Sequence, residues 1–189
     1  MRPLPRRPVL GPAEVRALLP HRPPLVLVDR VVGFRADPDP ALLAERDLDP
    51  DDPVFAAHFP GHPIWPGALI IEGLAQAAQL LLVLRAGAGG GVALGGAALV
   101  EGVPVGGVAV AAGAPLPPGI GVLTDVAVRL LRPVLPGQTL TYRVDLAGAF
   151  GAGFRMLVEA RVGRTPVAEG TISVAILPAS ATLPPGGAA

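Results

Sequence analysis

The sequence predicts an α+β domain in which an antiparallel sheet curves around one long apolar helix. The stretch from Gly67 to Arg85 is apolar at nearly every helical position, which is typical of a buried helix. The region from Val122 to Leu177 alternates between apolar and polar residues and is interrupted by short turns, a spacing typical of an antiparallel meander. A chain of 189 residues, 51% hydrophobic, is long enough to bury such a helix in one core.

The segments before the long helix carry the signals of a short helix and two strands. Gly11-Pro12, with Glu14 in the first turn, predicts the short helix. The apolar, β-branched run 25–34 predicts a strand. Residues 41–48 predict a second strand after the turn sequence ADPDP.

The ends of the chain are rich in proline, and the middle is rich in glycine. Residues 1–10 predict a flexible arm and residues 179–189 a flexible tail, so a single domain is expected over 11–178. In the Gly/Ala/Val-rich stretch 86–121 only short strands are expected, near 92–100 and 103–111. The strands expected at the C-terminal end are 122–131, 139–150, 154–162 and 167–177.

Composition excludes several classes of function. Fifteen basic and fifteen acidic residues cancel, and no recognition motif is present, so no nucleic-acid partner is expected. The chain has no cysteine, which rules out thiol catalysis and cysteine-ligated zinc. His58 and His62 flank a Pro-Gly turn instead of sharing a helix face, so no metal is expected. The run GAGGG follows a helix and lacks the lysine of a phosphate-binding loop.

The chain is expected to be cytoplasmic and without a membrane span. Proline interrupts the N-terminal segment, which therefore lacks the apolar core of a signal peptide. The long helix contains Glu72, Gln76 and Gln79, which makes it short and polar for a bilayer span.

Glu72 is the most informative residue of the long helix. An unpaired carboxylate on a buried helix is costly, so Glu72 must be neutral, hydrogen-bonded or beside a pocket that water reaches. Removal from water favours the protonated form, which makes Glu72 a candidate general acid. Alternatively, Glu72 faces solvent, or Gln76 holds it in a purely structural role.

His58 gives this carboxyl group a chemical partner. The histidine lies in a loop restricted by prolines and glycines, whose backbone suits the close approach of a ligand. The helix begins near Gly67, where free N–H groups are able to polarise a carbonyl oxygen. A base, an acid and an oxyanion donor together predict a proton-transfer site for a carbonyl compound.

Three stretches resemble one enzyme family. HFPGHPIWPGALIIEGLAQAA (58–78) resembles the active-site segment HFPGxPxxPGxLxxExxAQ of the β-hydroxyacyl-[acyl carrier protein] dehydratases, which have the hot-dog fold. LPHRPPLVLVDRV (19–31) is similar to the family's N-terminal motif, and RPVLPGQTL (132–140) to its RPVxPGDxL turn. The chain departs from the usual residues of the family at Pro23, Ala57, His62 and Trp65.

The resemblance implies a mechanism and an assembly. His58 would remove the C2 proton of a 3-hydroxyacyl thioester, and Glu72 would protonate the departing hydroxyl group. The N–H of Gly67 would bind the thioester oxygen. His58 and Glu72 would come from opposite subunits of a homodimer, alone or in a trimer of dimers, and no metal or organic cofactor would be needed.

The resemblance also implies contacts with the substrate and its carrier. An acyl chain attached to the phosphopantetheine of acyl carrier protein would lie in a tunnel between subunits. Arg129 and Arg132 are candidate contacts for the acidic carrier protein. The expected substrate-binding residues are Phe59, Pro60, Gly61, Ile64, Trp65 and Gln76.

Two other functions are compatible with these residues. A hot-dog thioesterase would use Glu72 to activate water and would release a free thiol. A non-catalytic acyl-binding subunit would carry an impaired site, for example through Ala57 or Trp65. The presence of both His58 and Glu72 favours the dehydratase.

Overall fold

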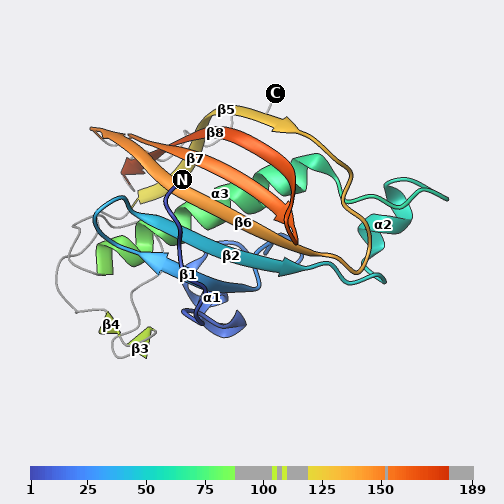
Figure 1. Cartoon of the computed structure of the whole chain (residues 1–189), viewed down its shortest axis with the longest axis horizontal. Helices are drawn as coiled ribbons and strands as arrows, with labels where there is room; N and C mark the ends of the chain where they lie inside the picture. Colours follow the sequence, from blue (N-terminus) through green and yellow to red (C-terminus); the bar gives the residue numbers. More distant parts are fainter. Residues whose placement is uncertain (88–103, 106–107, 110–118, 152, 179–189) are drawn as a thin grey trace, which may run out of the picture.

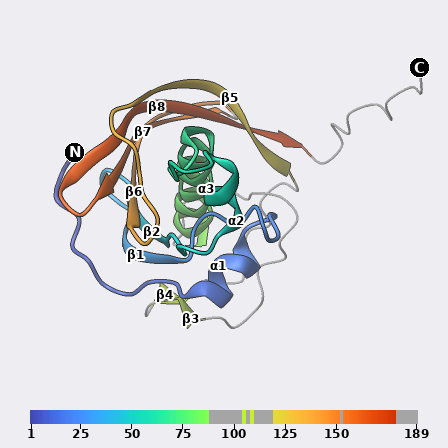
Figure 2. The same ribbon diagram turned by 90° about the vertical axis from the view of Figure 1, so that its right-hand side faces the viewer.

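A six-stranded antiparallel sheet curves around one long helix, α3 (Gly67–Arg85), so the predicted α+β arrangement is confirmed (Figures 1 and 2). The structure is a computed structural model that describes residues 1–87, 104–105, 108–109, 119–151 and 153–178. The strand order is β1-β2-β6-β7-β8-β5. The strands are β1 (Arg30–Arg35), β2 (Ala41–Asp47), β5 (Gly119–Leu130), β6 (Thr139–Phe150), β7 (Gly153–Val162) and β8 (Thr165–Pro178).

Helix α3 forms the centre of the core, and its bounds are those predicted. It begins after Pro66, and twelve of its residues are buried, among them Leu74, Leu80 and Leu81. By length and composition alone α3 also matches a membrane span, but 61% of the relevant window is buried inside the fold. We therefore interpret it as a core helix.

The sheet meets α3 through alternating residues, as the period of a strand requires. Along β7, Phe154, Met156 and Val158 are buried, whereas the residues between them are more exposed. On β6, Tyr142 lies so close to the helix that a Cβ at Gly73 would lie 2.4 Å from its ring. Glycine at this position therefore allows the sheet to approach α3.

The N-terminal arm contacts the sheet, whereas the sequence predicts a loose segment. The main-chain N–H groups of Arg7 and Val9 donate to the carbonyl groups of Val32 and Val31, along the outer edge of β1. Arg6 forms an ion pair with Glu45 on the outer face of the sheet. Figure 2 shows the arm running around the outside of the sheet. This cover explains why β2 is buried on both faces from Ala41 to Glu45.

Two local predictions differ from the structure. The expected strand 25–34 begins only at Arg30, because the main chain of Leu25 and Leu27 is hydrogen-bonded by the side chain of Gln76. A short helix, α2 (Pro53–Ala57), precedes the loop that begins at His58 and was not expected; Asp52 caps it by accepting from the N–H of Val54 at 2.9 Å. The predicted short helix is present as α1 (Pro12–Leu18).

The glycine-rich middle of the chain is only partly described. Two short strands, β3 (Pro104–Val105) and β4 (Val108–Ala109), pair within the expected range 103–111. The other expected strand, 92–100, and the tail 179–189 lie outside the described residues.

Candidate active site

His58 directly follows α2 and begins a tightly bonded loop. The N–H of Ile64 donates to the carbonyl of His58 at 2.9 Å, and Phe59 and His62 exchange two main-chain hydrogen bonds. The end of the loop is bonded to the segment between β5 and β6, because the N–H of Trp65 donates to the carbonyl of Val134 at 2.7 Å. The prolines and glycine of the motif thus form a closed loop with a fixed backbone.

The imidazole ring of His58 is held in a defined orientation. Its Nδ1 lies 3.1 Å from the carbonyl oxygen of Ile64, which can only accept a hydrogen bond and therefore selects the tautomer with hydrogen on Nδ1. The ring also stacks on Phe59, with centroids 4.0 Å apart. This arrangement leaves Nε2 with its lone pair available, as a general base requires.

A cavity of about 390 Å³ brings His58 to the beginning of α3. It is lined mainly by apolar side chains, and Gly67, the first residue of α3, contributes to its wall. The lining residues are His58, Ile64, Trp65, Gly67, Ile70, Leu130, Leu131, Arg132 and Pro133. Main-chain N–H groups at the start of a helix have no helical partners, so this wall carries partial positive charge.

Gly67 also lies directly against the side chain of Leu130. A Cβ at this position would lie 2.1 Å from Cδ1 of Leu130, at the end of β5. The absence of a side chain at Gly67 lets the last residue of β5 close the cavity beside the helix N-terminus.

Glu72 lies in a different environment in this chain. Its Oε1 accepts a hydrogen bond from Nε2 of Gln76 at 2.8 Å and lies 3.3 Å from Nε2 of His21. Its side chain is 37% exposed, so within a single chain it is only half-buried. This hydrogen bond from Gln76 fits a purely structural role of Glu72, in which Gln76 only holds the carboxyl group in place. It fits equally well a general acid that Gln76 orients for catalysis.

Glu72 does not line the cavity that contains His58. Residues five apart on a helix are separated by about 140° around its axis, so Gly67 and Glu72 face different directions. One chain therefore brings together His58 and Gly67 but not the carboxyl group.

The predicted substrate-binding residues separate into two groups. Ile64 and Trp65 line the cavity. Phe59, Pro60 and Gly61 are exposed on the loop beside it, where Phe59 stacks on His58.

Gln76 does not line this cavity within one chain, so its role in substrate binding stays a prediction. Its side chain is 1% exposed, and its amide bonds Leu25, Leu27 and Glu72, so it does not reach the cavity. The bonds to Leu25 and Leu27 have no signal in the sequence, because these partners lie about fifty residues away, whereas the bond to Glu72 is the one that the structural alternative predicts.

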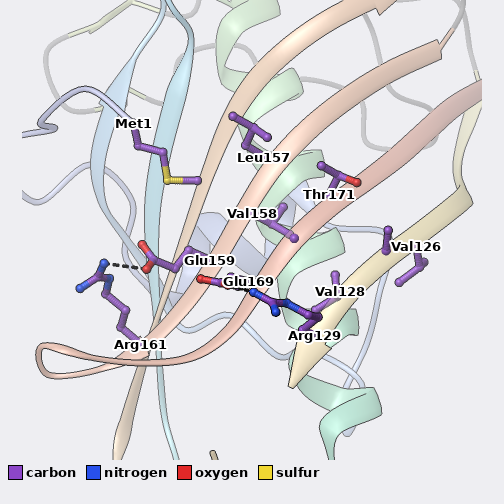
Figure 3. Close-up of a pocket in the computed structure, with 12 residues that line it drawn as sticks. Met1, Val126, Val128, Arg129, Leu157, Val158, Glu159, Arg161, Glu169 and Thr171 are labelled. Carbon is purple, nitrogen blue, oxygen red and sulfur yellow. Dashed lines mark hydrogen bonds and ion pairs between the residues drawn. The ribbon is translucent and has the colours of Figure 1, made fainter. Parts of the chain in front are cut away.

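The two arginines considered for carrier binding lie in different surroundings. Arg132 is exposed, lines the cavity and donates to the carbonyl of Pro166 at 3.1 Å. Arg129 lies on the outer face of the sheet, in a hollow of about 1000 Å³, where it pairs with Glu169 (Figure 3). Arg129 thus already has an ionic partner, Glu169, within the chain.

Comparison with known proteins identifies the family. A model of the FabA-like domain matches residues 19–103. The chain is 34% identical over 165 residues to the 3-hydroxyacyl-[acyl-carrier-protein] dehydratase FabZ of Anaeromyxobacter sp., covering 87% of this chain and 88% of that protein. It is 32% identical over 171 residues to FabZ of Chlamydia trachomatis serovar L2, covering 90% and 95%.

Solved structures support the same fold. The dehydratase heterocomplex ApeI:P from Xenorhabdus doucetiae matches with a TM-score of 0.62 at 17% identity, covering 88% of this chain and 92% of that chain. A hot-dog-like protein from Thermanaerovibrio acidaminovorans matches with a TM-score of 0.51 at 16% identity, covering 75% and 84%. The predicted hot-dog fold is therefore confirmed. Together with the relatives above, these findings show that the chain belongs to the 3-hydroxyacyl-[acyl-carrier-protein] dehydratase family.

Proposed function

We propose that this protein dehydrates (3R)-hydroxyacyl thioesters, carried on acyl carrier protein, to trans-2-enoyl thioesters in fatty acid or related acyl-chain biosynthesis. The observation that carries the proposal is the orientation of His58. Its Nδ1 is engaged by the carbonyl of Ile64, and its ring lies in an apolar cavity at the N-terminus of α3. Loss of a proton next to a carbonyl group requires such a base together with a fixed donor for the developing negative charge.

In the proposed reaction, Nε2 of His58 takes the proton from C2 of the substrate. The N–H of Gly67 stabilises the charge that develops on the thioester oxygen. The electron pair left at C2 forms the double bond as the C3–O bond breaks, and Glu72 gives its proton to the departing hydroxyl group, which leaves as water. Proton exchange with water then restores His58 and Glu72, and no metal or organic cofactor takes part.

We propose that each site combines His58 of one subunit with Glu72 of a second copy. Two features support a dimer. Glu72 does not line the cavity of its own chain. Strand β5, twelve residues long, pairs only with β8 among the described residues and exposes Leu123, Val126 and Leu130. A long apolar edge strand of this kind is usually covered by a partner.

The carrier protein is proposed to contact Arg132, because this exposed guanidinium lies at the cavity itself. Arg129, the other candidate, is paired with Glu169 and lies on the outer face. Arg132→Glu is expected to raise KM for the carrier-bound substrate but not for a short synthetic thioester, with Arg129→Glu as the matched control. An unchanged KM for the carrier-bound substrate would remove Arg132 from the proposal.

We further propose that the protein acts in the cytoplasm. Its most apolar helix, α3, is largely buried in the fold.

Complementation between subunits tests both the chemistry and the assembly. His58→Ala and Glu72→Gln should each lower kcat by about 10²–10⁴-fold, the usual contribution of a general acid or base. His62→Ala is the matched control, because His62 is exposed and its main-chain bonds remain. The assay is enoyl product formation, with free thiol followed in parallel to detect hydrolysis.

Unfolding and reassembling the two inactive variants together should restore activity. Half of the dimers would contain one chain of each kind, and each mixed dimer would have one complete site, so about a quarter of the wild-type rate is expected. Full activity of either single variant would refute its catalytic role. Inactive variants that fail to complement would refute the shared site.

A further inference from the structure

We propose that His21 is a positioning residue for Glu72: with Gln76 it holds Oε1 and so reserves Oε2 for proton transfer to the substrate. This inference rests on the proposed function, since it assumes that Glu72 is the general acid. The observation behind it is the distance of 3.3 Å between Nε2 of His21 and Oε1 of Glu72.

The two contacts of the carboxyl group fall on one oxygen. Gln76 donates to Oε1 at 2.8 Å, and His21 approaches the same atom. Among the described residues, Oε2 has no hydrogen-bond partner. A carboxyl group fixed through one oxygen cannot rotate freely about its last bond, so Oε2 points in a constant direction. Such pre-orientation is what a proton donor needs when its substrate is bound on a partner subunit.

The loop that carries His21 is anchored on both sides. Leu19 is buried in the core. Arg22 donates from its Nη1 to the carbonyl groups of Leu19 and His21, at 2.9 and 2.8 Å. After His21, the loop is tied to α3 by Gln76, which donates to the carbonyl of Leu25 and accepts from the N–H of Leu27, each at 2.8 Å. The backbone of His21 is therefore fixed relative to the helix that carries Glu72.

The surroundings of the His21 ring favour one of its two tautomers. Nδ1 of His21 is buried and has no hydrogen-bond partner among the described residues. A proton on Nδ1 would be a buried donor without an acceptor, which is costly. The form that fits carries its only proton on Nε2, the nitrogen that faces Glu72. In the proposal, the polar N–H at Nε2 lies against Oε1 across the 3.3 Å contact, and His21 does not itself exchange protons with the substrate.

Replacement of His21 by residues with and without a donor tests the proposal. His21→Leu should lower kcat by about two- to ten-fold, the value of one polar contact between neutral groups, with KM for the thioester nearly unchanged. His21→Gln should restore most of the rate, because the amide nitrogen of Gln can occupy the position of Nε2. Arg16→Leu, which removes an exposed charge five residues earlier, is the matched control.

A second comparison separates this proposal from that for Glu72. In the Glu72→Gln background, His21→Leu should cause no further loss, because the carboxyl group that it orients is absent. Circular dichroism and thermal melting identify a variant that has simply lost its fold. Equal rates of wild type and His21→Leu, no rescue by Gln, or additive losses in the double variant would each overturn the positioning role. If Glu72→Gln alone retained full activity, the proposed function itself would fail.

Discussion

Replacement of Gly73 by alanine should destabilise the protein, although helix propensity alone predicts the opposite. In an open helix this change adds about 0.5–1 kcal/mol of stability. In this protein the new Cβ would lie 2.4 Å from both Cζ and the hydroxyl oxygen of Tyr142, whose side chain is 0% exposed and has no room to move. Overpacking a dense core costs about 1–3 kcal/mol. Because both contacts would be as short as 2.4 Å, the upper part of the overpacking range applies, and after the propensity gain is subtracted we expect a net loss of about 1–2 kcal/mol.

Thermal melting and urea denaturation would measure this loss. For a chain of this length, the change corresponds to a decrease in Tm of about 2–8 °C. The double variant with Tyr142→Leu is the control, because without the aromatic ring the alanine should no longer be unfavourable. If Gly73→Ala were as stable as the wild type, or if its cost persisted without the ring, the contact would not be what holds α3 at its distance from β6.

Three other predictions follow from buried or paired groups. Tyr142→Phe should leave Tm unchanged or raise it, because the hydroxyl is buried without a partner among the described residues and burial raises the pKa of Tyr142, keeping it neutral. Trp65→Met should raise kcat/KM for long acyl chains relative to short ones, because Trp65 lines the cavity and packs on Phe55 at 5.4 Å; an unchanged ratio would contradict this. The hydrogen bond from Arg30 holds the pKa of Asp47 below its ordinary value of 3.8. The ionised side chain of Asp47 therefore stabilises the fold above pH 3.8, and this stabilisation is lost as the pH falls through the lowered pKa. Urea denaturation between about pH 5 and 2 should then show a shallower loss of stability for Asp47→Asn than for the wild type, and equal slopes would exclude a contribution from this side chain.

The elements that could be predicted are those whose signals are local. Pro66 followed by an apolar stretch ending at Arg85 defines α3, and the alternating pattern defines β6 with the bounds 139–150. Short helix α2 was missed, although Asp52 followed by proline is a recognisable helix start.

Contacts between distant segments could not be predicted in the same way. The apolar run 25–29 looks like a strand, but its main chain bonds the side chain of Gln76, which no local pattern encodes. His21 resembles a turn residue until the fold brings it to Glu72. In the active site, His58 and Gly67 were foreseen as neighbours, whereas the separation of Glu72 from their cavity depends on which way the helix faces.

The N-terminal segment also covers one edge of the sheet. Arg7 and Val9 occupy main-chain groups of β1, so among the described residues β5 is the sheet edge that stays available to a second copy. A sheet open on both sides could add chains indefinitely, as in a fibre. In the proposed dimer, edge-to-edge growth from β5 would end when two copies have met, so the first ten residues would favour a finite particle over a fibre.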